Sequence, residues 1–332
     1  MTDKNFDVVG IGNAIVDVIS TSNETFLEEQ ELPKGGMTLV DADRARRLYA
    51  ATGPTTEMSG GSAANTLAGL ASLGGQGGFI GKVRDDQLGE IFRHDIRSTG
   101  IAFTTLPAEE GAPTGRCLVF VTPDAQRTMA THLGISVTLG PEDLNHELIA
   151  EARVLYLEGY LWDAEAAKQA FLEAVETAKA NNTKVALSLS DPFCVERHRD
   201  SFLELIADHV ELLFANEQEA KSLYLCESLE DALAQLQDHC ETAVVTRSAA
   251  GSMILQDGSR FEVPAEALGE VVDSTGAGDL YAAGFLYGYT RGYPPSTSGR
   301  IGALAAGEVI SHVGPRPQQN LGALLAARDL DI

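Results

Sequence analysis

The alternation of apolar, strand-like segments with helical segments is the feature that most constrains how this chain can fold. From residue 154 onward the strand-like runs are VLYLEGY, KVALSLS, ELLFAN and TAVVTR, and the helical stretches between and after them cover 164–180, 200–208, 217–225 and 230–238. Strands that alternate with helices form parallel βαβ units, and such units build a sheet with helices on its faces. We therefore predict an α/β chain built on a doubly wound sheet.

The segments outside this run complete the predicted sheet and add a second, smaller one. We expect strands at 6–12, 79–81 and 269–273, a hairpin of 252–256 with 260–263, and helices at 62–73, 85–97, 276–290 and 300–312. Two further hairpins, one at 116–121 with 126–131 and one around 34–40, interrupt the strand–helix rhythm. We interpret these two as a small β lid over the main sheet.

Charge and cysteine content exclude several classes of protein. The 332 residues carry a formal charge of −24, which disfavours a nucleic-acid-binding surface because phosphate neutralisation needs basic side chains. The four cysteines, Cys117, Cys194, Cys226 and Cys240, form no C-x-x-C pair, so we expect reduced thiols in a cytoplasmic protein. We expect no signal peptide at the basic-poor N-terminus and, without a long apolar run, no membrane span.

The strongest chemical signal is the segment VVDSTGAGD at 271–279, which leads into a helical stretch. A Gly-rich turn that opens a helix presents free backbone N–H groups and the positive end of the helix dipole to an anion. Gly276, Ala277 and Gly278 would form that anion site. Asp279 follows in the first turn, where a carboxylate could accept the proton of a hydroxyl that attacks a phosphoryl group. The alternative is that Asp279 only complements the helix dipole.

Three weaker features accompany it. The segment SGGSAAN at 59–65 is a second Gly-rich helix entry, and Asn65 could bind a polyol or cap a buried helix. Asn13 and Asp17 lie in an apolar context, where ribose-like hydroxyls would satisfy polar groups that are costly to bury. The segment NEQE at 216–219 could organise hydrated Mg²⁺ or form an exposed capped turn.

Two nucleotide-binding patterns fail on inspection. GIGNAI at 10–15 and GAGDLY at 276–281 each lack the third glycine of a dinucleotide fingerprint. Lys82 follows a glycine, but position 76 is not glycine and Val83 stands where a P-loop needs Ser or Thr. A nucleotide site in this chain is therefore of another design.

Taken together, the motifs at 59–65, 216–219 and 273–279 resemble those of ribokinase-like carbohydrate and nucleoside kinases, most closely the adenosine kinase branch. The resemblance spans about residues 6–317. It implies a Rossmann-like three-layer α/β/α sandwich with a small β-sheet lid. We expect one kinase domain over 1–332, with lid segments 14–42 and 102–133 inserted in it.

The resemblance also implies roles for individual residues. Asp279 would be the catalytic base, Gly276, Ala277 and Gly278 the anion hole, and Arg127 a lid arginine that reaches the transferring phosphoryl group. The sugar hydroxyls would bind Asn13, Asp17, Gly60, Gly61 and Asn65. An apolar slot for a base would be formed by Met37, Leu39, Met129, Tyr160 and Phe193. ATP would lie against Asn216, Thr246, Arg247, Ser248, Gly251, Thr275, Ala303 and Ala306, and Glu219 would hold Mg²⁺ through water.

The predicted activity is ATP-dependent phosphorylation of the 5′-hydroxyl of adenosine. The alternatives are a kinase for ribose, fructose or a related sugar, a kinase for another nucleoside, and a binding protein that has lost catalysis. Ser248 stands where many members have Gly, and Thr275 stands where many adenosine kinases have Asn. The resemblance leaves open whether K⁺ binds near Asp273 and whether the chain is a monomer or a homodimer.

Overall fold

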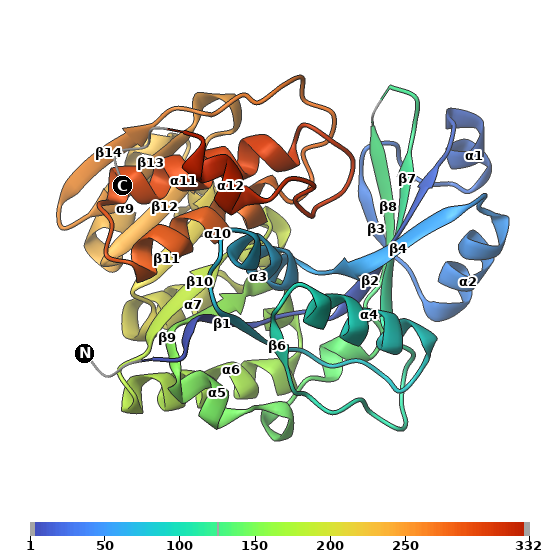
Figure 1. Cartoon of the computed structure of the whole chain (residues 1–332), viewed down its shortest axis with the longest axis horizontal. Helices are drawn as coiled ribbons and strands as arrows, with labels where there is room; N and C mark the ends of the chain where they lie inside the picture. The colour runs from blue at the N-terminus through green and yellow to red at the C-terminus, as the bar shows by residue number, and fades with distance from the viewer. Residues whose placement is uncertain (1–3, 125, 329–332) are drawn as a thin grey trace.

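The protein contains two β-sheets, one large and one small (Figure 1). The computed structural model describes residues 4–124 and 126–328, so both ends of the expected 1–332 domain lie outside the described residues. In spatial order the large sheet contains β14 (Ser259–Val263), β13 (Ser252–Gln256), β12 (Thr242–Thr246), β11 (Leu212–Asn216), β10 (Lys184–Ser188), β9 (Ala152–Glu158), β1 (Phe6–Ile11), β5 (Gly77–Ile80) and β6 (Ala102–Phe103). Neighbours from β12 to β6 pair in parallel, and the pairs β12–β13 and β13–β14 are antiparallel.

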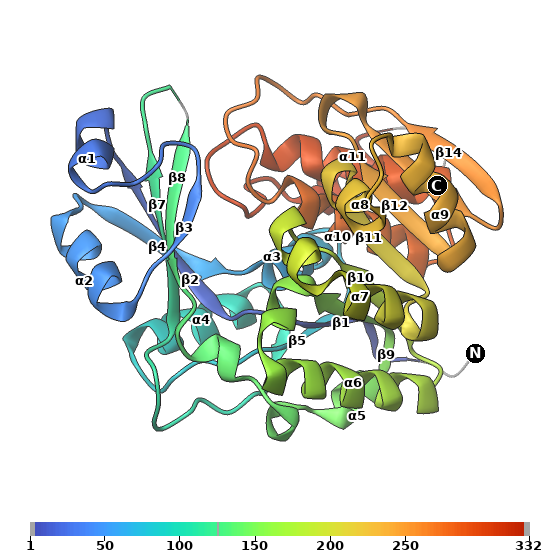
Figure 2. The same cartoon turned by 180° about the vertical axis from the view of Figure 1, so that it is seen from behind.

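Helices cover both faces of the large sheet (Figures 1 and 2). The helices are α1 (Glu24–Glu29), α2 (Ala42–Ala51), α3 (Ser62–Ser72), α4 (Gln87–Ser98), α5 (His146–Ala150), α6 (Glu165–Ala180), α7 (Pro192–His209), α8 (Glu217–Tyr224), α9 (Leu229–His239), α10 (Ala277–Thr290), α11 (Pro295–Val309) and α12 (Leu321–Ala326). Helices α5 and α6 pack on one face, and α3 and α10 pack on the other. The predicted three-layer α/β/α architecture is confirmed.

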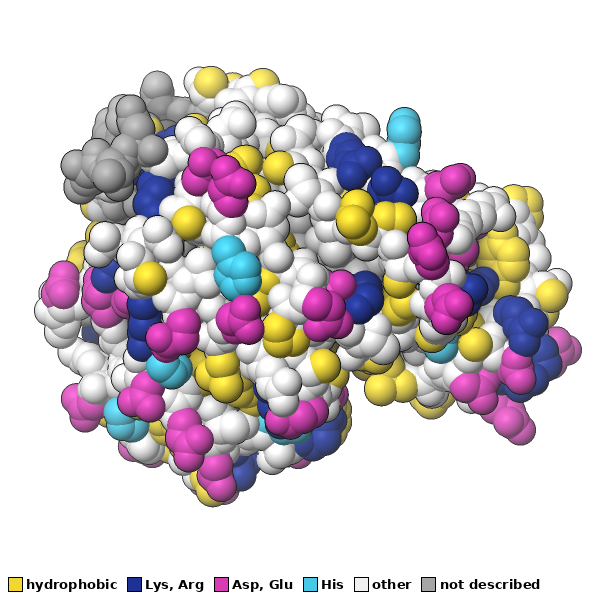
Figure 3. All heavy atoms as spheres, turned by 90° about the horizontal axis from the view of Figure 1, so that it is seen from below, with side chains coloured by type: hydrophobic (Ala, Val, Ile, Leu, Met, Phe, Trp, Pro, Cys, Tyr) yellow, Lys and Arg dark blue, Asp and Glu magenta, His cyan; other side chains and the backbone are white. Residues whose placement is uncertain are grey.

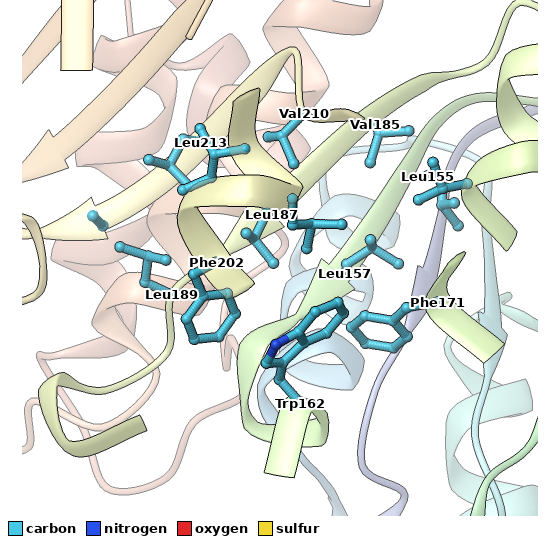
Figure 4. Packing of buried hydrophobic residues seen from close by; sticks show 14 of the residues in the cluster. Leu155, Leu157, Trp162, Phe171, Val185, Leu187, Leu189, Phe202, Val210 and Leu213 are labelled. Carbon is cyan, nitrogen blue, oxygen red and sulfur yellow. The ribbon is translucent and has the colours of Figure 1, made fainter. Parts of the chain in front are cut away.

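The core on the α6–α7 face shows why strand periodicity predicted the sheet. Leu155 and Leu157 of β9 point toward this face, while the alternating residues Val154 and Tyr156 contribute to the opposite cluster. Trp162 lies between Phe171 and Phe202, with ring centroids 5.8 and 5.7 Å apart (Figure 4). The burial of these large aromatic rings stabilises the packing of α6 and α7 against this face of the sheet.

The small sheet stands beside the large one and carries α1 and α2 on its outer side (Figure 1). Its strands, in spatial order, are β3 (Met37–Leu39), β8 (Arg127–His132), β7 (Gly115–Val121), β2 (Ile15–Thr21) and β4 (Thr55–Gly60). The predicted hairpin of 116–121 with 126–131 is confirmed as the antiparallel pair β7–β8. The predicted lid sheet is therefore present, and it also includes β4, which lies outside the two expected lid segments.

Four predicted elements need correction. The 34–40 region is not a hairpin, because only β3 forms there and it pairs in parallel with β8. The segment 269–273 forms no strand, because the N–H groups of Val272 and Asp273 donate to the carbonyl of Ile310 at the end of α11 instead of to a sheet. The helix expected at 200–208 is the second half of α7, which begins at Pro192 and kinks at His198, and α11 covers Pro295–Val309 rather than 300–312.

Candidate functional site

A cavity of about 910 Å³ lies where the carboxyl ends of the parallel strands face the small sheet. Its lining comes from β2, β3, β7 and β8 of the small sheet and from the loops and helices that follow β1, β9, β10, β11 and β12. The surface is hollowed where the small sheet meets the main body (Figure 3). Ligands of open α/β sheets bind outside the carboxyl ends of the strands, so this cavity is the candidate active site.

The N-terminus of α10 lines the cavity and has the features of an anion-binding site. Gly276 is the N-cap residue, with a φ of +76°, and no side chain caps the helix. The first N–H groups of a helix have no intrahelical partners, so they remain available to a ligand. A Cβ atom added at Gly278 would meet nothing within 4 Å, so open space lies directly above this turn. Gly276, Ala277 and Gly278 all line the cavity.

The Asp279 carboxylate is held at both oxygens beside this turn. Its Oδ1 accepts a hydrogen bond from the Ser62 hydroxyl at 2.6 Å, and its Oδ2 accepts one from the Asn65 amide at 2.9 Å. Burial raises the pKa of Asp279, while these two hydrogen bonds and the charge of Arg316 oppose the rise. A carboxylate oriented in this way, with a raised pKa, is suited to accept a proton from a bound hydroxyl.

The polar floor of the cavity offers acceptors for hydroxyl groups. The Oδ1 atom of Asn65 is buried and has no hydrogen-bond partner among the described residues. Asp17, on β2, is buried, and burial raises its pKa to about 6 against the opposing charges of Arg316 and Arg127. Because an unpaired buried acceptor costs free energy, Asn65 favours a ligand that donates hydrogen bonds, and the Asp17 carboxylate on the same cavity wall offers a further acceptor.

Glu158 supports this floor from the end of β9. Its Oε1 accepts hydrogen bonds from the backbone and the side-chain amide of Asn13 at 3.3 and 2.8 Å. Its Oε2 accepts one from the backbone N–H of Ala63, at 2.9 Å. Burial raises the pKa of Glu158 to about 7. The Asn13 Oδ1 atom accepts from the Ser136 hydroxyl at 2.8 Å, so the amide that faces the cavity is fixed on both sides.

Large apolar side chains surround the mouth of the cavity. Met37 and Leu39 of β3 are 45% and 58% exposed, and Phe193 at the start of α7 is 68% exposed. Tyr160, in the 3₁₀ turn after β9, is 36% exposed, and Met129 of β8 completes the group. Exposed apolar side chains that converge on one cavity indicate a ligand with an apolar surface.

Part of the expected ATP site also lines the cavity. Asn216 and Thr246 lie at the carboxyl ends of β11 and β12, and Thr275 lies before the anion site. Asn216 and Glu219 form a capping box at the start of α8, in which the Asn216 N–H donates to Glu219 Oε2 at 2.9 Å and the Asn216 amide donates to Oε1 at 2.5 Å. Burial raises the pKa of Glu219 to about 7. Glu219 thus has a structural contact as well as a place on the cavity wall.

Seven expected site residues do not line this cavity: Gly60, Arg127, Arg247, Ser248, Gly251, Ala303 and Ala306. The Arg127 guanidinium is instead engaged in a buried ion pair, in which it donates to Asp273 at 2.6 Å. Gly60 lies beneath the Asp17 carboxylate, where a Cβ atom would come within 2.5 Å of Asp17 Cγ. The residues of 247–251 form a turn beyond β12, and Ala303 is buried on the core-facing side of α11.

Among the residues that the sequence reasoning missed are Ser62 and Glu158, which line the cavity, and Arg316, which contacts Ser59 beside it. Ser62 stands inside the SGGSAAN motif, so that motif could have pointed to it. Glu158 ends a buried strand, as Asn216 does, so its place at the carboxyl end of a strand could have marked it as a candidate in the same way. Arg316 lies in the loop after α11 and donates to the carbonyl of Ser59, which is 257 residues away, and no local pattern marks it.

Among residues 4–124 and 126–328, no group of three or more His, Cys, Asp or Glu side chains is placed to hold a metal ion. Within the same ranges, no helix combines the length and the apolar character needed to cross a membrane.

Comparisons with known proteins agree with this geometry. The adenosine kinase from Sinorhizobium meliloti is 50% identical, with a TM-score of 0.91, and the match covers 97% of this chain and 99% of that one. A probable sugar kinase from Rhizobium etli is 47% identical, with a TM-score of 0.93 and coverage of 98% and 99%. A 5-dehydro-2-deoxygluconokinase from Shouchella clausii is 27% identical over 93% of this chain and 90% of its own length.

The family model for pfkB carbohydrate kinases matches residues 30–320. Kinases of this family use ATP and act on small-molecule substrates. The ribokinase-like fold expected from the motifs is also that of the Sinorhizobium meliloti structure. The chain belongs to the pfkB family of carbohydrate kinases.

Proposed function

We propose that this kinase phosphorylates the 5′-hydroxyl of adenosine with ATP. The observation that carries the proposal is the pairing of two different surfaces in one cavity. Its floor presents hydroxyl acceptors, Asp17 and Asn65, and its mouth presents Met37, Tyr160 and Phe193. A nucleoside has one polar and one flat apolar half, and it matches such a cavity. The 50% identical adenosine kinase from Sinorhizobium meliloti supports the same acceptor.

In the proposed reaction Asp279 removes the proton from the 5′-hydroxyl, and that oxygen attacks the γ-phosphorus of ATP. The bond from that phosphorus to the β–γ bridging oxygen breaks, and ADP leaves. Ser62 and Asn65 orient the base, and the N-terminus of α10 stabilises the negative charge on the transferring group. The small sheet would exclude water, which would otherwise compete as the acceptor.

Mg²⁺ bound to the ATP phosphates would supply further positive charge in this site. Glu219 could hold Mg²⁺ only through a bridging water molecule, because both of its carboxylate oxygens already accept hydrogen bonds from Asn216. The residues do not fit K⁺ at Asp273, because the Arg127 guanidinium occupies that carboxylate. The expected contact of Arg127 with the transferring phosphoryl group would require it to leave Asp273.

A sugar acceptor is the second candidate, and the 47% identical probable sugar kinase from Rhizobium etli favours it. The anion site and Asp279 would serve either acceptor equally. The apolar mouth would not, because a free sugar has no flat apolar half to cover it.

The test is Mg²⁺-dependent ADP release from ATP with a panel of acceptors: adenosine, inosine, guanosine, cytidine, ribose, fructose, 5-dehydro-2-deoxygluconate and none. We expect strong turnover with adenosine. Phe193→Ala and Tyr160→Ala should raise the KM for adenosine by about tenfold or more, because each removes aromatic surface from the mouth. Turnover with a sugar alone, unchanged in both variants, would overturn the adenosine assignment.

A further inference from the structure

The loop after α11 touches three parts of the candidate active site at once. Pro315 lies under the anion site, where a Cβ atom at Gly276 would come within 2.9 Å of it. The N–H of Gly314 donates to Asp273 Oδ2 at 2.8 Å. Arg316 reaches the end of β4 in the small sheet. This loop therefore joins the phosphate side of the cavity to the acceptor side.

Arg316 holds the turn that forms the acceptor floor. Its Nε and Nη2 atoms donate to the Ser59 carbonyl at 3.1 and 2.8 Å, and Nη2 also donates to the Ser59 hydroxyl oxygen at 2.9 Å. The backbone N–H and the hydroxyl of Ser59 in turn donate to Asp95 Oδ2, at 2.7 and 2.5 Å. Ser59 is fully buried and directly precedes Gly60 and Gly61. A planar guanidinium that forms several hydrogen bonds to one residue fixes the orientation of that residue more firmly than a point charge can.

Arg316 is partly buried, and within residues 4–124 and 126–328 it forms no ion pair. Its Nη1 atom is buried and has no hydrogen-bond partner within the described ranges. Burial lowers the pKa of Arg316, and the charges of Asp95, Asp17 and Asp279 oppose that effect. Arg127 also acts on Asp17, but its guanidinium is already paired with Asp273. An unpaired buried N–H is costly, so the orphaned Nη1 atom of this cation calls for a function.

We propose that Arg316 is a positioning residue for phosphoryl transfer, one that fixes the Ser59–Gly61 turn and places a permanent positive charge near the carboxylates of Asp17 and Asp279. The charge favours the ionised form of both carboxylates, in which they accept hydrogen bonds and protons. The inference rests on the proposed function in one respect, because it takes Asp279 as the base.

The direction of the expected pH effect follows from the groups around these carboxylates. Burial raises the pKa of both, and Arg316 lowers it again. Other charges and acids face them too: Arg127 and Cys117 lie near Asp17, and Tyr156, Glu158, Tyr160 and Glu219 lie near Asp279. All of these remain when Arg316 is replaced. Loss of its charge should therefore move both pKa values upward.

The first test compares Arg316→Met, Arg316→Lys and Ser59→Ala by the pH profile of kcat/KM. We expect Arg316→Met to lower kcat/KM at neutral pH by about 10- to 100-fold and to move the acidic limb of the profile up by about one unit. Arg316→Lys should restore the position of the limb, because it restores the charge. Ser59→Ala should raise KM and leave the limb in place. Arg291→Met is the matched control, since Arg291 stacks on Tyr287 outside the cavity.

The proposal is overturned if the limb of Arg316→Met coincides with that of the wild type, or if Arg316→Lys moves the limb as far as Arg316→Met does. A second measurement needs no acceptor. The loss of thermal stability in Arg316→Met, relative to wild type, should grow as the pH rises from 5 to 8, because the carboxylates then lose a compensating charge. A loss that does not change with pH would contradict the proposal. If the acceptor panel shows no turnover, the proposed function fails and this second measurement alone decides.

Discussion

At the scale of single residues, Glu158 is a buried acid whose titration should be visible in the stability of the protein. Burial raises its pKa in the folded state from 4.5 to about 7. The folded state therefore binds the proton more tightly than the unfolded chain. Its contribution to stability is full below pH 4.5 and declines as the pH rises through about 7.

Glu158→Gln removes this titration and keeps the size of the side chain. We expect the free energy of unfolding of the variant, relative to wild type, to rise by about 2 kcal/mol between pH 5 and pH 8. Urea unfolding at the two pH values measures the change. Glu176→Gln, on the exposed side of α6, is the control and should show no such trend. An equal trend in both variants would mean that Glu158 does not titrate in this range.

The contrast between Asp279 and Arg316 shows which site residues a sequence can reveal. Asp279 could be predicted because an apolar run, a glycine turn and the start of a helix follow one another within nine residues, at 271–279. Arg316 acts on Ser59 across 257 residues, and Asn13 meets Glu158 across 145. Contacts of that kind depend on the order of strands in the finished sheet, which no local spacing encodes.

At the scale of elements, the N-terminus of α10 contains two glycines, Gly276 and Gly278, whose structural and catalytic roles can be distinguished by experiment. Gly276 has a φ of +76°, and a Cβ there would collide with Pro315 at 2.9 Å. Gly276→Ala should therefore lower the free energy of unfolding by about 1–3 kcal/mol and also lower turnover.

A Cβ at Gly278 meets no protein atom within 4 Å. Gly278→Ala should keep or raise stability, by up to about 1 kcal/mol, because alanine favours a helix. Its methyl group would occupy the space of the anion, so turnover should still fall at least tenfold. Thermal unfolding and steady-state kinetics on both variants measure these effects. Full activity in Gly278→Ala would show that no phosphate binds above this turn.

The elements also show where prediction from periodicity failed. The apolar run at 269–273 has strand-like residues, yet Val271 is exposed and the backbone bonds to the end of α11. A hydrophobic pattern shows which side chains a segment can bury. The hydrogen-bond partners of its backbone depend on the rest of the fold.

At the scale of the whole molecule, the buried pair of Arg127 and Asp273 links the small sheet to the loop before the anion site. The distance is 2.6 Å, and Asp273 also accepts hydrogen bonds from the backbone of Thr275 and Gly314. Removal of one partner would leave the other charge buried. Arg127→Met and Asp273→Asn should each lower the free energy of unfolding by about 3–5 kcal/mol.

The double variant should lose clearly less than the sum of the two single losses, because no unpaired charge remains. Denaturant unfolding of the four proteins measures this coupling. Losses that simply add would mean that the pair does not couple the small sheet to this loop energetically.

The central claim is that Asp279 is the base in phosphorylation of a nucleoside, and one comparison tests it most directly. Asp279→Asn keeps the shape and the contact with Ser62, but it cannot take up the proton. Turnover with adenosine and MgATP should fall by about 100- to 10,000-fold, while adenosine affinity measured by calorimetry should change by less than about tenfold. Turnover near that of the wild type would contradict the account.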